Sequence, residues 1–304
     1  MDHPLLSGGS EAAHRLRAQM HRFAHPRVPV LLTGETGAGK SLVAEGLHTA
    51  AGRGGPFVRL SLGIRSHLTE DEVRGHVPGA FTGAVGSRKG LLERAHQGTC
   101  LLDEFHRAHE EQLGLFLDIC DGRPVQPLGG SRPAIVDAKM IFATNLPPHA
   151  LHKEAGLPMD LLNRLGLCHI RVPALREAPE AILPMALYYL ARCLDRVGKA
   201  FVPRLSPGLR RELQDYPWPG NLRQLEHAML AVATQLSEER EAEVSDLPDL
   251  DLFTRPTPAA APPTESAHAA VRAAGGNKRQ AARNLGISPT TLNKHLKEEG
   301  PTPT

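Results

Sequence analysis

The stretch that decides the fold is GETGAGKS, which comprises Gly34, Glu35, Thr36, Gly37, Ala38, Gly39, Lys40 and Ser41. It directly follows the apolar run Val28-Pro29-Val30-Leu31-Leu32 and precedes a predicted helix over about 41–50. In such a strand–loop–helix unit the backbone N–H groups of the loop surround phosphate oxygens, and the helix adds its positive dipole end. The alternative, a chance match in a chain with 29 glycines, does not account for the flanking strand and helix. The pattern therefore predicts a phosphate-binding P-loop in an α/β fold.

A second apolar strand is predicted over Gly98–Glu104 (GTCLLDE), and it ends in two adjacent carboxylates. Parallel sheets bind ligands at the carboxyl ends of their strands, so Asp103 and Glu104 are expected beside the P-loop. Lys40 would reach the β- and γ-phosphates of a nucleotide, whereas Ser41 and Asp103 would hold Mg²⁺. Glu104 would orient or deprotonate the attacking water. The predicted chemistry is hydrolysis of ATP, with ATP and Mg²⁺ as cofactors.

A third strand is predicted over Lys139–Asn145 (KMIFATN), immediately before a proline-rich turn. Strands separated by helical stretches predict a three-layer α/β domain with a parallel sheet. Asn145 has two interpretations of equal weight. It senses the γ-phosphate or positions water, or it only begins a turn.

Composition limits what the rest of the chain can be. The 304 residues suffice for about two domains, and 41% apolar residues are ordinary for a globular protein. No apolar run approaches the roughly 18 residues that span a bilayer, and the first residues do not resemble a signal peptide. We therefore expect a cytoplasmic protein without a membrane partner. The four cysteines form no CxxC pair, which argues against a disulfide framework or a zinc site and favours core thiols: Cys100, Cys120, Cys168 and Cys193.

A helical subdomain is predicted downstream of these strands. The segment PWPGN at 217–221 forms a rigid turn, and apolar residues then recur at helical spacing over about 222–236. Asn221 is the predicted N-cap of this helix, because its side chain can accept from the first-turn N–H groups. Trp218, the only tryptophan, is predicted to lie in the core of this subdomain.

An abrupt change in composition marks a domain boundary after this helix. Residues 237–251 are strongly acidic and residues 254–264 are rich in proline and alanine, which predicts a linker. Beyond it, residues 265–299 hold six Lys or Arg against three Glu. Three short helices are predicted there, and the Gly-Ile-Ser turn between the last two makes a helix-turn-helix: 265–274, 278–285 and 289–297.

Between the P-loop and the carboxylate strand lies the hexapeptide GAFTGA, formed by Gly79, Ala80, Phe81, Thr82, Gly83 and Ala84. With it the chain resembles the sigma-54-dependent transcriptional activators, also called bacterial enhancer-binding proteins, a branch of the AAA+ ATPases. The resemblance covers about 6–300 in the family's order and spacing, through GETGAGKS, GHVPGAFTGA, GTCLLDE, ATN and YPWPGNLRQLE. The tail GGNKRQAARNLGISPTTLNKHLK resembles the Fis-type DNA-binding domain that ends these activators.

The resemblance implies a role for the GAFTGA loop and for one lid arginine. The loop would contact the sigma factor, mainly through Phe81 and Thr82, and an exposed Phe on a glycine-rich loop is costly unless it docks on a partner. From the residues alone, the alternative is that Phe81 folds back into the core. Arg223 matches the family's second sensor, which reaches the nucleotide phosphates from the lid. The alternative for Arg223 is an exposed position on the lid helix.

The resemblance of the tail implies binding to double-stranded enhancer DNA. Thr290, Thr291 and Lys294 would face the major groove, while Lys278 and Arg279 would meet phosphates. A three-helix interaction module that binds no DNA is the alternative.

The chain also departs from the family's pattern. Ser61 stands where the family usually has an Asn that exchanges hydrogen bonds with the catalytic glutamate, so coupling to the GAFTGA loop would be altered. Of the two arginines that reach into the neighbouring subunit's ATP site, Arg164 is kept, but the other position holds Pro158. An arginine finger contributes about 10³–10⁵-fold to phosphoryl transfer, so we expect weakened but real turnover. The alternative for Arg164 is a surface ion pair.

The resemblance implies an AAA+ core over 1–172, a helical lid over 173–236, a linker over 237–264 and a helix-turn-helix domain over 265–304. The partners would be sigma-54 RNA polymerase, enhancer DNA and further copies of the chain in a ring, expected to be a hexamer. No regulatory domain is expected before the core, so control would come from expression level, a regulatory protein or a co-assembled paralogue. Two alternatives are a DNA-bound regulator that barely hydrolyses ATP and an AAA+ remodeller of another client.

Overall fold

The computed structural model describes residues 3–62, 70–165, 168–236, 240–250, 267–278, 281 and 292. The chain divides into two compact units, Met1–Asp246 and Leu247–Thr304. The first unit contains the P-loop, the GAFTGA loop and the predicted lid, and the second contains the predicted helix-turn-helix.

A five-stranded parallel sheet forms the centre of the first unit, with strand order β2-β5-β6-β1-β7. Its strands are β1 Val30–Thr33, β2 Phe57–Ser61, β5 Thr99–Asp103, β6 Lys139–Thr144 and β7 His169–Arg171. The strands that end at the P-loop, at the two carboxylates and at Asn145 are therefore neighbours, β1 beside β6 and β6 beside β5. A short antiparallel pair, β3 Gly75–His76 and β4 Arg88–Lys89, flanks the GAFTGA loop.

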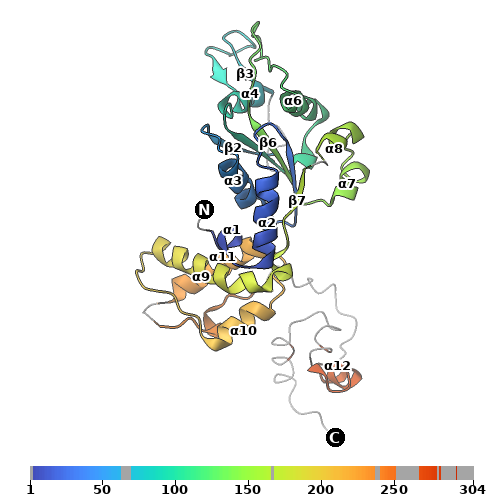
Figure 1. Ribbon diagram of the computed structural model, residues 1–304. Helices are drawn as coiled ribbons and strands as arrows, with labels where there is room; N and C mark the ends of the chain where they lie inside the picture. The colour runs from blue at the N-terminus through green and yellow to red at the C-terminus, as the bar shows by residue number, and fades with distance from the viewer. Residues whose placement is uncertain are drawn as a thin grey trace. The chain divides into compact units, whose positions relative to one another are not determined.

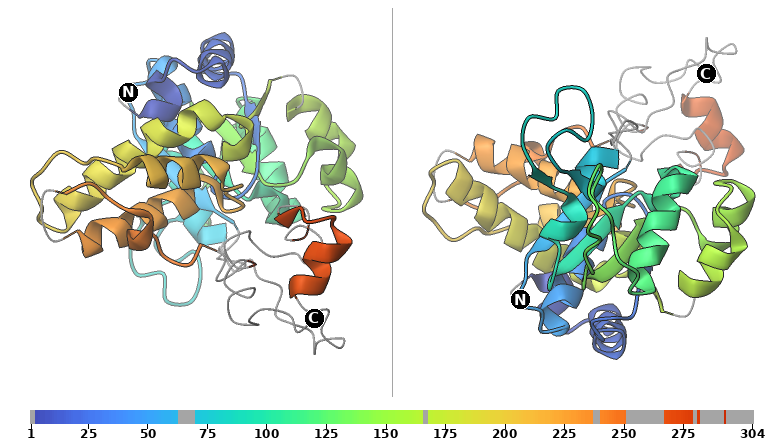
Figure 2. Two further views of the ribbon diagram at one scale, coloured as in Figure 1. Left: turned by 90° about the horizontal axis from the view of Figure 1, so that it is seen from below. Right: turned by 90° about the horizontal axis from the view of Figure 1, so that it is seen from above.

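Helices cover both faces of this sheet, as the views in Figure 1 and Figure 2 show. Alternate side chains of the strands enter two separate cores, one with Leu32 and Ile141 and the other with Leu31 and Phe142. The first core is closed by α2 Glu11–Arg22 and α3 Lys40–Ala50. The second is closed by helices from the other side: α4 Glu70–Arg74, α5 Leu91–Arg94, α6 Glu110–Cys120, α7 Pro148–Lys153 and α8 Met159–Leu165. The predicted three-layer α/β class is confirmed.

The lid packs below the sheet in the view of Figure 1. Its helices are α9 Pro179–Arg196, α10 Pro207–Asp215 and α11 Asn221–Gln235, and short pieces accompany them: α1 Pro4–Ser7 and the 3₁₀ turns η2 Leu175–Glu177 and η3 Val244–Asp246. Trp218 is fully buried and its indole N–H donates to the Leu213 carbonyl at 2.8 Å, which confirms its predicted core position.

The acidic segment after α11 differs from the sequence expectation. Residues 237–264 were expected to form a linker, but the part from Arg240 to Asp246 belongs to the lid. Leu205 and Ala242 form a β-bridge, and the buried Asp246 carboxylate accepts two hydrogen bonds from the Arg240 guanidinium at 2.7 Å. A bidentate ion pair to a buried carboxylate needs a fixed backbone, so this segment is folded onto the lid.

The second unit contains α12 Ala267–Ala273, where the first of the three tail helices was expected. Among the residues of this unit that the structure describes, Ala270, Ala281 and Leu292 are buried together, and Lys278 is exposed at the surface. The remaining predicted DNA-contacting residues lie outside the described residues: Arg279, Thr290, Thr291 and Lys294.

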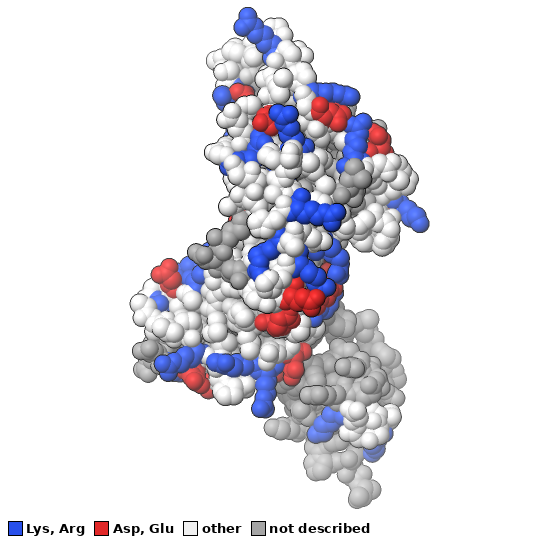
Figure 3. Space-filling model, in the orientation of Figure 1, with Lys and Arg blue, Asp and Glu red and all other residues white. Residues whose placement is uncertain are grey.

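Two further sequence expectations concern the surface and the cysteines. All four cysteines are free thiols. Within the part of the chain that the structure describes, no helix is long and apolar enough to cross a membrane. On the face drawn in Figure 3, basic and acidic side chains are interspersed over the first unit, in keeping with a formal net charge of +2.

Candidate nucleotide-binding site

The P-loop has the backbone geometry that phosphate binding needs. Gly37 and Gly39 have φ values of 77° and 102°, which only glycine adopts without strain. α3 begins at Lys40 without a side-chain cap, so the N–H groups of its first turn remain available to an anion. The Lys40 ammonium lies inside the loop and donates to the carbonyls of Gly34 at 2.7 Å and Glu35 at 3.0 Å. Burial lowers the Lys40 pKa, with the nearby Asp103 and Glu104 carboxylates opposing that shift.

A cavity of about 200 Å³ opens beside the P-loop and brings the predicted site residues together. It is lined by residues from the loop, from the ends of β5 and β6, and from the lid helix α11: Thr36, Gly37, Gly39, Lys40, Ser41, Asp103, Glu104, Asn145 and Arg223. Five further lining residues were not predicted from the sequence: Leu42, Arg59, Tyr189, Leu222 and Glu226. Cations, carboxylates and a hydroxyl converge here, which is the donor set that a magnesium–triphosphate group requires.

The two carboxylates at the end of β5 are held in different ways. Asp103 accepts a hydrogen bond from Arg59 at 2.6 Å and another from the Glu104 N–H at 3.1 Å. Glu104 has a φ of 56°, a left-handed conformation that is uncommon outside glycine and that turns the chain sharply after the strand. Its carboxylate lies 3.7 Å from the Arg107 guanidinium in the 3₁₀ turn η1 Phe105–Arg107. Ser61, on the neighbouring β2, stands opposite Asp103 in the strand register.

A histidine supports the strand that ends at Asn145. The His106 ring is hydrogen-bonded to the Thr144 hydroxyl at 2.9 Å, and burial lowers the His106 pKa. Asn145 itself is exposed and lines the cavity. An imidazole tied to β6 therefore fixes Thr144, the residue next to Asn145.

The lid is bonded directly to the P-loop. The buried Asn221 amide donates to Glu35 at 3.1 Å and to the Thr36 carbonyl at 3.1 Å, and its oxygen accepts from the Leu175 N–H at 2.8 Å. The expected N-cap role of Asn221 is therefore wrong. Gly220 holds the cap position, and Asn221 has a φ of 54° that aims its side chain at the loop.

An ion pair and a backbone contact complete this junction. Arg176 in η2 binds both carboxylate oxygens of Glu35, and the hydrogen bonds from Arg176 and Asn221 lower the Glu35 pKa to about 2. The Leu222 N–H donates to the Gly37 carbonyl at 3.0 Å. A Cβ at Gly37 would lie 2.4 Å from the Gly220 carbonyl oxygen, so this approach requires glycine.

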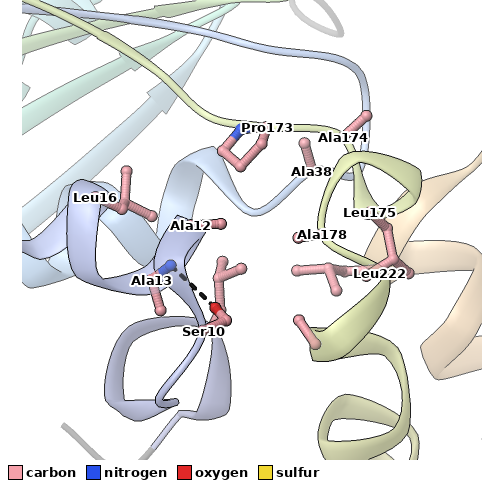
Figure 4. A pocket seen from close by; sticks show the side chains of 12 residues that line it. Ser10, Ala12, Ala13, Leu16, Ala38, Pro173, Ala174, Leu175, Ala178 and Leu222 are labelled. Atoms are coloured by element: carbon pink, nitrogen blue, oxygen red, sulfur yellow. Dashed lines mark hydrogen bonds between the residues drawn. The ribbon is translucent and has the colours of Figure 1, made fainter.

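An apolar cleft adjoins the phosphate cavity and shares Leu222 with it (Figure 4). Its walls come from α1, α2, the P-loop and the lid, and include Leu5, Leu16, Ala38, Leu175 and Leu222. The free volume is about 10 Å³, so these walls must part before a flat ring can enter. No charged motif marks these residues in the sequence, and the cleft was not predicted.

Arg164 lies outside this cavity. Its guanidinium contacts Asp121 at 2.5 Å and Asp160 at 3.2 Å, and its side chain is 38% exposed. Pro158 is exposed directly before α8. Arg164 therefore forms a surface ion pair within its own chain, and in its own chain it does not line the nucleotide cavity.

The GAFTGA loop projects at the end of the first unit opposite the lid (Figure 1). Hydrogen bonds from Gly79 N–H to the Ala84 carbonyl and from Ala84 N–H to the Phe81 carbonyl close it on itself. Phe81 is 47% exposed, and its ring packs edge-to-face with the His76 ring at a centroid distance of 5.1 Å. The alternative in which Phe81 folds into the core is therefore wrong. Val85, which follows the hexapeptide, is 92% exposed and was not predicted.

Three family models match the chain. The sigma-54 interaction domain matches residues 6–171, the AAA+ ATPase lid domain matches 176–262, and the bacterial regulatory protein, Fis family, matches 268–298. The first match alone covers more than half of the chain and contains the P-loop, the GAFTGA loop and both carboxylates.

Curated relatives and solved structures agree with these matches. The anaerobic nitric oxide reductase transcription regulators NorR of Salmonella paratyphi B and Salmonella typhimurium are 36% identical over 241 residues, 77% of this chain and 47% of theirs. The chain thus spans about half the length of these relatives. NtrX from Brucella abortus superposes with a TM-score of 0.71 at 27% identity, covering 97% of this chain and 69% of NtrX. NtrX in complex with ATP gives a TM-score of 0.68 at 26% identity, with the same coverage.

Proposed function

The chain belongs to the family of sigma-54-dependent transcriptional activators, and from this premise we propose that it is an ATP-hydrolysing activator that remodels closed complexes of sigma-54 RNA polymerase. The observation that carries the proposal is the cavity in which Lys40, Asp103 and Glu104 meet Asn145 and Arg223. These residues come from the P-loop, two strand ends and the lid, which is how an ATPase surrounds a triphosphate.

Each residue of the cavity has a task that its position supports. Lys40 and Arg223 bind the phosphates, and Ser41 with Asp103 holds Mg²⁺, which supplies charge neutralisation at the phosphates when bound. Glu104 orients or deprotonates the water. The apolar cleft beside Leu222 would accept the base, because stacking on aliphatic walls suits a flat ring. That the structural relative NtrX is described in complex with ATP supports this nucleotide.

The same proposal assigns two further surfaces. Residues Gly79–Ala84, with Phe81 and Thr82 exposed at the tip, contact sigma-54. The tail, matched by the Fis-family model, binds enhancer DNA through Lys278 and through Arg279, Thr290, Thr291 and Lys294. Copies of the chain assemble into a ring, expected to be a hexamer, in the bacterial cytoplasm. A regulatory protein or a paralogue controls this assembly in trans.

Steady-state ATPase measurement on the full chain tests the motor, with Glu104→Ala as the inactive reference. Wild-type turnover is expected to exceed that of the variant by at least about 10²-fold, the contribution of a positioned general base. Equal rates would reject hydrolysis as the activity.

A second candidate function is a DNA-bound regulator that binds ATP and barely turns it over. The exposed Pro158, in place of a second finger arginine, and Ser61, opposite Asp103, favour it. Nucleotide binding without turnover above the Glu104→Ala rate would establish this function instead.

Formation of open complexes on a sigma-54 promoter tests the partner. The wild-type chain is expected to open the promoter and Thr82→Ala is expected to open it far less. Full ATPase activity with no opening would identify a remodeller of some other client.

A further inference from the structure

Arg59 is a charged residue in the middle of a strand of the parallel sheet. Its neighbours Val58 and Leu60 are buried, whereas Arg59 itself has a side chain that is 47% exposed. The strand register places Arg59 opposite Leu101 and Ser61 opposite Asp103, so Arg59 and Asp103 lie on one face of the sheet, two residues apart along it. The long side chain spans that offset and places its guanidinium 2.6 Å from Asp103 at the carboxyl edge.

The guanidinium has donors to spare. Among the residues that the structure describes, Asp103 is the one hydrogen-bond and ion-pair partner of Arg59. An arginine carries five N–H donors in a fixed fork, and Arg59 lines the same cavity as Lys40 and Ser41. The side chain is therefore anchored by one contact and keeps further donors for a ligand of the cavity that it lines.

The balance of charge in the cavity also depends on Arg59. Three cations line it, Lys40, Arg59 and Arg223, and three carboxylates line it as well: Asp103, Glu104 and Glu226. Without Arg59 the lining would hold one more carboxylate than cations, and the missing cation would be the one beside Asp103. With it, the lining is neutral before Mg²⁺ and nucleotide enter.

The strand order indicates which phosphate of a bound nucleotide would lie nearest to Arg59. The P-loop follows β1, and Arg59 is on β2, which lies beyond β6 and β5 at the sheet's edge. A phosphate chain that starts in the P-loop and passes Asn145 and Glu104 reaches Arg59 last. We infer that Arg59 binds the terminal phosphate of the nucleotide, with Asp103 holding its guanidinium in position. This inference rests on the proposed function, because it takes the cavity to bind ATP.

Binding of two nucleotides that differ in the terminal phosphate tests the assignment without any hydrolysis. Isothermal titration calorimetry with Mg²⁺ compares β,γ-imido-ATP with ADP on the full chain and on Arg59→Ala. Loss of a charged hydrogen bond to the terminal phosphate is expected to raise the Kd for β,γ-imido-ATP about tenfold and to leave the Kd for ADP within about twofold. Arg59→Lys keeps the positive charge but loses the forked donors, so its Kd for β,γ-imido-ATP is expected to lie between those of wild type and Arg59→Ala. Arg15→Ala, at an exposed ion pair on α2, is the matched arginine control.

Three results would overturn the assignment while leaving the proposed function intact. In Arg59→Ala, the affinities for β,γ-imido-ATP and for ADP could both stay at their wild-type values, or both could weaken by the same factor. Alternatively, Arg59→Ala could bind β,γ-imido-ATP more tightly than wild type at low Mg²⁺, which would mark Arg59 as a competitor of the metal. Failure of the wild-type chain to bind either nucleotide would instead remove the proposed function, and the inference with it. Thermal melting of Arg59→Ala and Arg59→Lys within a few degrees of wild type shows that the comparison reports on the site.

Discussion

The side chain of Asn221, at the start of a lid helix, donates a hydrogen bond to the Glu35 carboxylate of the P-loop at 3.1 Å. The residues are 186 positions apart in the chain, and the same amide also holds the Thr36 carbonyl and the Leu175 N–H. One buried side chain therefore joins three segments around the nucleotide cavity.

Asn221→Gly tests the energetic weight of this junction. The substitution keeps the positive φ but leaves the Leu175 N–H buried without its acceptor, so the free energy of unfolding should fall by about 1–3 kcal/mol. Asn221→Ala should lose about 1 kcal/mol more, because alanine is strained at a φ of 54°. Urea unfolding measures both changes. A glycine variant as stable as wild type would show that the side chain does not hold the lid.

The Arg164→Ala variant tests whether Arg164, which does not line the nucleotide cavity of its own chain, acts in the cavity of a neighbouring subunit. If Arg164 serves a neighbouring site, the turnover number should fall by about 10³-fold or more while ATP binding persists. Mixing Arg164→Ala with Glu104→Ala subunits should then restore part of the ATPase rate, since some junctions would combine an intact Arg164 with an intact Glu104. Mixtures no more active than the sum of their parts would mean that Arg164 only pairs with Asp121.

The burial of His3 is expected to make the free energy of unfolding depend on pH. The ring is buried between Tyr188 and Tyr189, and its Nδ1 accepts from the Leu5 N–H at the start of α1. Burial, aided by the charge of Arg192, lowers the His3 pKa from 6.5 to about 4. Between these values the unfolded chain binds the extra proton, so stability is full above pH 6.5 and is lost as the pH falls toward 4.

Titration of His3 changes the free energy of unfolding by at most about 1.4 kcal/mol per pH unit. His3→Asn keeps an acceptor for the Leu5 N–H but does not titrate, so its free energy of unfolding should fall less steeply between pH 6.5 and 5. Urea unfolding at several pH values compares the two proteins. Parallel pH profiles would mean that the His3 ring is protonated in the folded state.

Replacing Lys139 by a side chain of similar volume without the ammonium is expected to reduce stability strongly. Its fully buried ammonium donates to the carbonyls of Phe23, His25 and Val28 at 2.9, 2.9 and 3.1 Å. Lys139→Met fills the same volume but leaves these carbonyls without their donor, and should cost about 3 kcal/mol or more. Thermal unfolding measures the loss, and Lys199→Met, at a less buried pair of carbonyl contacts, is the comparison. Equal melting temperatures for the two variants would contradict this account.

The sequence predicted the parts of the site that depend on chain order. A P-loop after a strand and two carboxylates after another must meet at one edge of a parallel sheet, so Lys40, Asp103 and Glu104 followed from pattern alone. Arg59 was missed because its contribution depends on side-chain reach across a strand. The signal was there, since a charged residue between Val58 and Leu60 is unusual in a strand that belongs to a buried sheet.

Other residues could not be predicted by local rules. Asn221 fits the N-cap preference, and only tertiary structure shows that its backbone turns the amide toward Glu35. The apolar cleft is built from small aliphatic residues of α1, α2 and the lid, which in sequence are indistinguishable from ordinary core. The part of the acidic segment from Arg240 to Asp246 has the composition of a linker, but one arginine pairs its buried carboxylate and folds it onto the lid.

The hydrogen bond from the Leu222 N–H to the Gly37 carbonyl has an evolutionary consequence. It joins main chain to main chain, so among single substitutions only proline at 222 deletes its donor. Many side chains around it can change without removing it, but residue 37 must remain glycine, and a displacement of the P-loop turn would reach the lid through the peptide backbone. One link between the two subdomains is thereby inherited with the backbone of the fold, alongside the side-chain bonds that Asn221 adds.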